Sequence, residues 1–256
     1  YHRFPAADFQ PSEHRFELQL GPHFFSRDKL QLDLPELRGT LHLKNPYPWP
    51  SRLLAPGIMG WYSFVPFMEC YHGIVSMDHQ LYGQLDVYGA PVDFTGGQGY
   101  AEKDWGRSFP AAWIWLQSNS FDREGRCSIM ASVAKIPWLG SSFVGFIVGF
   151  LVDGKLHQFA TYNGSRMKAS AEGQEVRLAF RRKDRELQLI ARQAEGTPLV
   201  APIDGAMAGK VNESLLAEVE VRLFQNQKLL FEGRGRQSGM ELAGEVEALL
   251  TEKWRK

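Results

Sequence analysis

Apolar and polar residues alternate with a two-residue period along most of the chain, which is the pattern of half-buried β-strands. Residues 113–119 are rich in ring and branched side chains, which predicts a strand, and the almost wholly apolar residues 143–152 predict a strand buried on both faces. Asp153-Gly154 and Asn163-Gly164 are hairpin turn signals. Further short strands are predicted at 155–162, 175–180, 185–192, 216–224 and 228–233. The sequence therefore predicts a mainly all-β fold, an antiparallel β-barrel or sandwich.

The C-terminal end is the exception to this pattern. Apolar residues from Leu242 to Leu250 recur at helical spacing, and Ser238 with Glu241 has the spacing of a capping box. We therefore predict one α-helix over about 239–252.

Composition narrows the class of protein. The 256 residues are 44% hydrophobic and 23% charged, which is ordinary for a folded protein with a sizeable core. The 29 basic and 29 acidic side chains cancel, and this balance argues against a nucleic-acid-binding protein. The 17 Phe, 8 Tyr and 7 Trp residues are typical of a protein with a large apolar interior or with a hydrophobic ligand.

Cysteine usage and the N-terminal sequence bear on the compartment. Cys70 and Cys127 are too few for a disulfide framework and fit a reducing environment. The first residues lack the apolar stretch of a signal peptide, and the longest apolar run has ten residues where a membrane helix needs about 20. We expect a cytoplasmic protein, with peripheral membrane contact left open.

The densest candidate chemistry lies in residues 96–110. If this segment is extended, Glu102 and Asp104 point to one face and Lys103 to the other. Two neighbouring carboxyl groups can raise the pKa of one of them into the range of a useful acid. The alternative is two solvated carboxylates, or a pair bound to nearby Lys and Arg. The glycines do not form a phosphate-binding loop, because no Gly-Lys-Ser/Thr follows.

The next strand carries a stripe of large and polar side chains. Alternation places Trp113, Trp115, Gln117 and Asn119 on one face. Such a stripe could line an elongated apolar cavity and stabilise a carbocation by cation–π attraction, or it could be ordinary core packing.

A third cluster lies in residues 68–79, where His72 and Glu69 stand near Cys70, Asp78 and His79. The spacings match no zinc pattern, so we expect no metal. Glu69 and His72 are better interpreted as polar groups near a pocket or as satisfied buried residues.

Several separated motifs, in order along residues 20–165, resemble the tocopherol cyclase family. The central segment carries Glu102-Lys103-Asp104-Trp105-Gly106, Ser108-Phe109-Pro110, Trp113-Ile114-Trp115 and Gln117-Ser118-Asn119. The flanking segments carry Ala55-Pro56-Gly57-Ile58-Met59-Gly60, Val65-Pro66-Phe67-Met68-Glu69-Cys70, His72-Gly73, Ser76-Met77-Asp78-His79 and Ile136-Pro137-Trp138-Leu139-Gly140. Two departures are the absence of an N-terminal Glu-Gly-Trp-Tyr motif and Ser120 where relatives often carry His.

The resemblance implies two lipocalin-like domains, here an N-terminal part over 1–70, expected to be incomplete, and a C-terminal part over 71–256. It also implies cofactor-independent cyclisation of a prenylated hydroquinone to a chromanol, with a more distant likeness to carotenoid hydratases and pericyclases. The implied catalytic residues are Asp104 or Glu102 as the acid, assisted by His72 or Glu69. The implied substrate-binding residues are Trp105, Trp113, Trp115, Gln117, Asn119 and Tyr100.

Two other functions stay open at this point. The chain could be a non-catalytic carrier of a hydrophobic isoprenoid, which needs no proton donor in its cavity. It could also be a hydratase that adds water to an isoprenoid double bond. In each case the expected partner is a hydrophobic small molecule, without nucleic acid, and transient membrane contact would deliver it.

Overall fold

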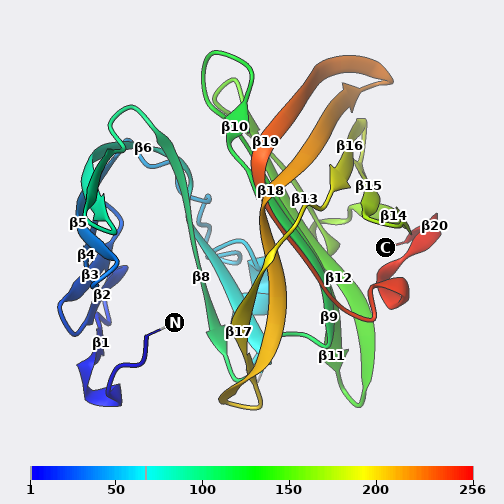
Figure 1. Ribbon diagram of the computed structural model, residues 1–256. Helices are drawn as coiled ribbons and strands as arrows, with labels where there is room; N and C mark the ends of the chain where they lie inside the picture. Colours follow the sequence, from blue (N-terminus) through cyan, green and yellow to red (C-terminus); the bar gives the residue numbers. More distant parts are fainter. Residues whose placement is uncertain (1, 67, 256) are drawn as a thin grey trace. The chain divides into compact units, whose positions relative to one another are not determined.

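The computed structural model describes residues 2–66 and 68–255, and antiparallel strands dominate them (Figure 1). The helical segments in this described part are four short 3-10 turns: η1 (Ala6–Asp8), η2 (Gly60–Phe64), η3 (Thr161–Asn163) and η4 (Val246–Leu249). None of them is long and apolar enough to cross a membrane as a helix. The prediction of an all-β antiparallel fold is confirmed.

The chain forms two compact units, and it passes between them three times. Unit 1 contains residues 1–49 and 74–103, and unit 2 contains residues 50–73 and 104–256. The division into 1–70 and 71–256 stays a prediction. Segment 50–73, which carries several of the family-like motifs, thus belongs with the C-terminal part of the chain.

Unit 1 is built on an eight-stranded antiparallel sheet. The path runs β1-β2-β3-β4-β5-β6-β7, and β8 pairs with β6. Residues 70–73 of β6 and 104–106 of β8 belong to unit 2. Gly99 is required on β8, because a Cβ there would lie 2.3 Å from Nε2 of the buried His79. The strands are β1 (Phe9–Pro11), β2 (Glu17–Leu20), β3 (His23–Ser26), β4 (Lys29–Asp33), β5 (Leu37–Lys44), β6 (Cys70–Val87), β7 (Ala90–Asp93) and β8 (Gln98–Gly106).

Unit 2 is built on a twelve-stranded antiparallel sheet with the path β13-β12-β11-β9-β19-β18-β16-β15-β14-β20. In addition, β10 pairs with β19 and β17 pairs with β18. The strands are β9 (Ala112–Ser118), β10 (Ser120–Phe121), β11 (Cys127–Trp138), β12 (Ser141–Val152), β13 (Lys155–Ala160), β14 (Arg166–Glu172), β15 (Glu175–Arg182), β16 (Arg185–Arg192), β17 (Thr197–Ile203), β18 (Ala206–Gln225), β19 (Lys228–Gly244) and β20 (Thr251–Arg255).

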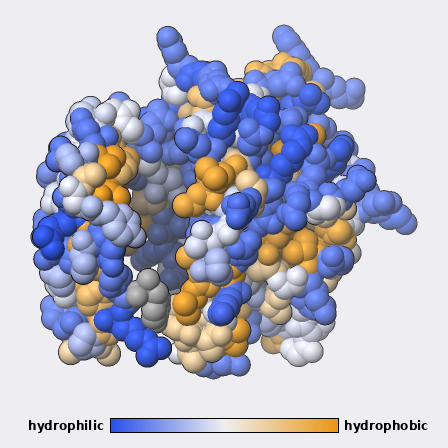
Figure 2. All heavy atoms as spheres, viewed as in Figure 1, coloured by the Kyte–Doolittle hydropathy of each residue, from blue (hydrophilic) through white to orange (hydrophobic). Residues whose placement is uncertain are grey.

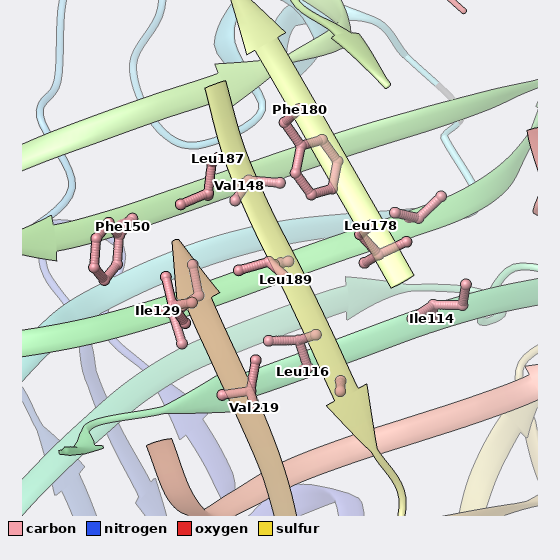
Figure 3. Packing of buried hydrophobic residues seen from close by; sticks show 14 of the residues in the cluster. Ile114, Leu116, Ile129, Val148, Phe150, Leu178, Phe180, Leu187, Leu189 and Val219 are labelled. Carbon is pink, nitrogen blue, oxygen red and sulfur yellow. The ribbon is translucent and has the colours of Figure 1, made fainter. Parts of the chain in front are cut away.

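One hydrophobic core joins the strands of unit 2. Ile114 and Leu116 of β9 are fully buried in it, together with side chains from strands at both ends of the sheet path. Because one face of so many strands shares a single core, the sheet curls around that face. Figure 3 shows these side chains meeting between the strands, among them Ile129, Val148, Phe150, Leu178, Phe180, Leu187, Leu189 and Val219.

The turn at Asp153-Gly154 confirms one hairpin prediction. It joins β12 to β13, and both residues have positive φ, 49° for Asp153 and 70° for Gly154. Positive φ at both central residues fits the right-handed twist of the flanking strands, which is why Asp-Gly occurs here.

The predicted C-terminal helix is wrong. Residues 239–244 continue strand β19 and pair with β9, the chain then makes the 3-10 turn η4, and residues 251–255 form β20. Met240 and Leu249 both reach the core from this non-helical backbone. Pairing with β9 satisfies the backbone hydrogen bonds of 239–244, so tertiary contacts override the local helical spacing.

Apolar side chains also lie exposed on unit 2. They concentrate on β17 and β18, and Figure 2 shows orange patches among the blue charged side chains on the face turned to the viewer. The exposed residues of these strands include Leu199, Val200, Ile203, Met207, Leu215 and Leu216.

Candidate functional site

The end of β8 is held against the start of β6 by a backbone clamp. The carbonyl oxygen of Glu69 accepts hydrogen bonds from the backbone N–H groups of Arg107 (2.8 Å) and Ser108 (3.3 Å). Gly106 has φ +155°, and a Cβ at this position would lie 2.0 Å from that same oxygen. Glycine is therefore needed for the close approach. Glu69 thus contributes its backbone carbonyl to the site.

This clamp places an imidazole beside a carboxylate. Nδ1 of His72 on β6 lies 2.6 Å from Oδ1 of Asp104 on β8, and the two side chains are 15% and 26% exposed. The distance is that of a short, charge-assisted hydrogen bond. A proton held between these groups can be given up or taken back, which is the property required of a general acid–base pair.

Trp105 lies next to this pair in sequence and packs on the same part of unit 2. Its ring stacks on Tyr71 with a centroid distance of 5.5 Å and an interplanar angle of 12°. The hydroxyl of Tyr71 donates to the carbonyl of Val65 at 2.8 Å, which fixes the ring. Trp105 remains about half exposed, so one of its faces is accessible.

The stripe on β9 faces away from the core of unit 2. Ile114, Leu116 and Ser118 are buried, whereas Trp113, Trp115, Gln117 and Asn119 lie half-buried at the alternate positions. The core-packing interpretation of the tryptophans is therefore excluded for the core of this unit. We call this second side of the sheet the outer face.

The polar atoms of the stripe are withdrawn from solvent. Nε1 of Trp113 donates to Oε2 of Glu241 at 2.6 Å. Nε1 of Trp115, Nε2 of Gln117 and Nδ2 of Asn119 are buried and have no hydrogen-bond partner within the described ranges 2–66 and 68–255. A buried donor left unpaired costs about 1–3 kcal/mol, so a row of them is typical of a surface that binds an acceptor.

An apolar cavity of about 70 Å³ lies on the outer face beside the stripe. Two residues of β11 that line it, Ser132 and Ala134, are the direct cross-strand neighbours of Trp115 and Trp113. The cavity and the tryptophans thus share one continuous sheet surface. The other lining residues come from β11 and β12, from the chain before β6 and from η3: Met59, Tyr62, Met68, Ile136, Phe143, Gly145, Phe146, Ile147, Thr161 and Tyr162.

Aromatic rings close one side of this cavity. Tyr62 lies 6.0 Å from Trp138, 6.1 Å from Phe143 and 6.4 Å from Tyr162 between ring centroids, and it stacks on Trp61 at 4.0 Å. Burial raises the pKa of the Tyr62 phenol and raises the pKa of Tyr162 to about 12. Both phenols therefore stay neutral, and their ring faces can attract a cation without reacting as bases.

Met59 contacts both the cavity and the backbone of His72 in the imidazole–carboxylate pair. Met59 lines the cavity, and its Sδ accepts the backbone N–H of His72 at 3.1 Å. The chemistry available on unit 2 is therefore a proton-holding pair, an apolar cavity bordered by ring faces, and buried donors along β9.

Glu102 and Tyr100 belong to unit 1. The hydroxyl of Tyr100 donates a short hydrogen bond to the carboxylate of Glu102, two residues along β8. Of the predicted site residues, unit 2 thus brings together His72 with Asp104 and the four β9 residues with each other.

Sequence reasoning misses the residues that surround the stripe. Tyr62 and Met59 stand in a segment with no periodic pattern, and the helical spacing assigns Glu241 to a helix cap. A signal for Glu241 exists, because Gly239-Met240-Glu241-Leu242 alternates small or polar with apolar residues, as a strand with one buried face does.

The fold and site define an all-β protein with an apolar, aromatic-bordered cavity and an imidazole–carboxylate pair. The model of the tocopherol cyclase-like family matches residues 34–244, and the chain belongs to that family.

Two curated relatives are plant proteins. The probable chloroplastic tocopherol cyclase of Oryza sativa subsp. japonica is 23% identical over 197 residues, which cover 72% of this chain and 42% of the relative. The chloroplastic tocopherol cyclase of Zea mays is also 23% identical over 197 residues, which cover 72% of this chain and 41% of that protein. The matched region therefore spans about two fifths of the length of these relatives.

Two solved structures are similar at low identity. A putative AttH from Nitrosomonas europaea gives a TM-score of 0.44 at 18% identity, covering 89% of this chain and 69% of that one. Kievitone hydratase from Nectria haematococca gives a TM-score of 0.45 at 11% identity, covering 91% and 70%.

Proposed function

We propose that the protein catalyses the acid-dependent cyclisation of a prenylated hydroquinone to a chromanol. Membership of the tocopherol cyclase-like family supports this reaction class. The observation that carries the proposal is the His72–Asp104 pair, whose Nδ1 and Oδ1 atoms lie 2.6 Å apart. Met59, which lines the apolar cavity, accepts the backbone N–H of His72. The reaction is an isomerisation, so it requires no redox cofactor.

The proposed reaction begins with proton transfer. The His72–Asp104 pair gives a proton to the less substituted carbon of the prenyl double bond, which leaves a tertiary carbocation at the other carbon. The phenol oxygen then attacks that carbon, a six-membered ring closes, and the phenol loses its proton. The mass of the molecule does not change.

The apolar surface supports the carbocation step. The cavity is lined mainly by apolar side chains, which offer few hydrogen bonds to water, and the nearby ring faces of Tyr62, Trp113 and Trp115 would stabilise positive charge. Trp105 adds a further accessible ring face next to Asp104. Gln117 and Asn119 supply buried donors for the oxygens of the ring. The partner on this proposal is a hydrophobic small molecule.

The test is incubation of the purified protein with a panel of prenylated hydroquinones under anaerobic conditions. We expect a product of unchanged mass with altered retention, which is lost in Asp104→Asn and in His72→Gln. Asp122→Asn is the matched control, because Asp122 is an exposed carboxylate of unit 2 paired with Arg236 at 3.1 Å. Full turnover in Asp104→Asn contradicts the proposed acid.

Two other outcomes would redirect the proposal. Saturable binding of the same compounds with no isomer formed would support the carrier function. A product heavier by one water would support a hydratase. For the hydratase, loss of that product in Asp104→Asn but not in Asp122→Asn would assign Asp104 as the acid.

A further inference from the structure

The outer face of unit 2 holds a second polar group beyond the stripe on β9. Glu241 of β19 lies directly across from Trp115 of β9, and Glu213 of β18 lies directly across from Glu241. Since opposite residues of antiparallel strands point to the same side, Trp115, Glu241 and Glu213 form one row across three strands. Neither glutamate is used in the reaction proposed above.

The ring of Trp115 and the carboxyl group of Glu213 meet over Gly239. A Cβ at Gly239 would lie 2.9 Å from Cζ3 of Trp115 and 3.9 Å from Oε1 of Glu213. The ring edge and the carboxylate therefore both reach over this glycine from opposite neighbouring strands. Glu241 is fixed from the other side by the indole N–H of Trp113 at 2.6 Å.

The row combines hydrogen-bond acceptors with donors that lack partners. Two carboxylates directly opposite each other repel, and this repulsion is relieved when a hydroxyl donates to them. Nε1 of Trp115 and Nε2 of Gln117 are buried without a hydrogen-bond partner in the described chain. On the same face, the hydroxyl of Ser128 is likewise unpartnered among the described residues, and Ser128 is completely buried. A hydroxyl group both donates and accepts, so it complements this mixture of groups.

We propose that Glu213 and Glu241 bind the hydroxyl groups of an aromatic ligand that lies against Trp113 and Trp115. This inference deepens the proposed function: during ring closure the C–O bond forms, the phenol O–H bond breaks, and its proton passes to the carboxylate of Glu213. The proton given to the alkene is thereby balanced by the proton taken from the phenol. Burial raises the pKa of Glu213, which makes its carboxylate a stronger base than an exposed one.

The test separates binding from turnover by using a small probe that cannot cyclise. Trimethylhydroquinone and its dimethyl ether have the same ring, but only the first has O–H donors. We expect calorimetric titration to show at least tenfold tighter binding of the hydroquinone by the wild-type protein. Glu213→Gln and Glu241→Gln should weaken this preference, because a neutral amide oxygen accepts a hydroxyl less strongly than a carboxylate does. Glu232→Gln should keep it, because Glu232 is an exposed residue of β19 paired with Arg222 at 2.7 Å.

A second variant keeps the test valid if the glutamine variants do not fold. Gly239→Ala leaves every charge in place and adds a methyl group between Trp115 and Glu213, so it should weaken binding of both probes alike. Equal affinity for the two probes in the wild type, or unchanged binding in Gly239→Ala, overturns the inference. Glutamate-dependent binding in a protein that forms no chromanol supports this inference and contradicts the proposed function instead.

Discussion

Gly106 gives the sharpest test of how the His72–Asp104 pair is built. A methyl group at Gly106 would lie 2.0 Å from the carbonyl oxygen of Glu69, which is a backbone atom and cannot rotate away. The strand β8 must then move from Glu69, and Asp104, two residues earlier, moves with it. Gly106→Ala should therefore lower both the stability of the protein and the activity of the pair.

The magnitude follows from two contributions. Holding alanine at φ +155° costs about 1–3 kcal/mol of backbone strain. Moving the strand to relieve the overlap with the Glu69 carbonyl costs a further amount of about 1–3 kcal/mol, which is the cost of an added methyl group in a well-packed core. We expect Gly106→Ala to lower the free energy of unfolding by about 2–6 kcal/mol in total.

Two other glycines separate these contributions. Gly125 has φ +84°, and a methyl group added there would have no described atom within 4 Å, so Gly125→Ala should show the strain alone. Gly57 has neither a positive φ nor a close neighbour in the described chain, so Gly57→Ala should be neutral or slightly stabilising. The assay is urea unfolding followed by tryptophan fluorescence, with wild type and all three variants measured together.

The decisive comparison is Gly106→Ala against Gly125→Ala. If both lose the same stability, the close contact with Glu69 does not exist, and the explanation of how Asp104 is positioned is refuted. If Gly106→Ala loses more stability but retains full turnover, the clamp is real and the position of Asp104 does not depend on it.

Further predictions concern the core and the outer face of unit 2. Burial lowers the pKa of His157 from 6.5 to about 4. The contribution of neutral His157 to the free energy of unfolding is therefore complete above pH 6.5 and is lost as the pH falls towards 4. Urea unfolding should show a free energy of unfolding lower by up to about 3 kcal/mol at pH 4.5 than at pH 7.5, and this difference should be absent in His157→Gln. Ile114→Ala should cost about 2–5 kcal/mol of unfolding free energy, because Ile114 is completely buried. Trp113→Phe and Glu241→Leu should couple in a double-mutant cycle by about 0.5–3 kcal/mol, and additive effects would contradict their hydrogen bond.

The strand β9 illustrates what local pattern can and cannot establish. Alternation predicts the strand and places Trp113, Trp115 and Gln117 on one face, as observed. It cannot say which face meets the core, because Ile114 and Leu116 on the other face are also apolar. That choice depends on the strands from 127 to 240 that pack against Ile114, and these contacts lie far away in sequence.

The C-terminal segment shows the opposite failure, in which a local pattern predicts the wrong element. Leu242, Leu249 and Leu250 suit a helix, but Leu242 pairs with Ile114 across β19 and β9. The register of this pairing is set by residues more than 100 positions away. The error also hides Glu241, whose position on the outer face becomes visible only when residues 239–244 are recognised as a strand.

For the imidazole–carboxylate pair, the sequence predicts the two residues but not their contact. His72 and Asp104 are both among the predicted site residues, but they are 32 positions apart, and no spacing rule joins them. The pairing of β6 with β8 brings them to 2.6 Å. The resemblance thus names both residues, and the sheet supplies their geometry.

The two faces of the unit 2 sheet divide stability from chemistry, and this division makes the functional proposals testable. Substitutions at the buried positions of β9, such as Leu116, remove core contacts and should change the free energy of unfolding. Substitutions at the alternate positions, such as Trp115 and Gln117, leave those contacts in place and remove buried donors that have no partner in the described structure. Removing an unpaired buried donor also removes its desolvation penalty, so Gln117→Leu should leave the free energy of unfolding unchanged or raise it. On the proposal that these donors bind the ligand, Gln117→Leu should lose ligand binding without losing stability, and a loss of stability in this variant would contradict the assignment.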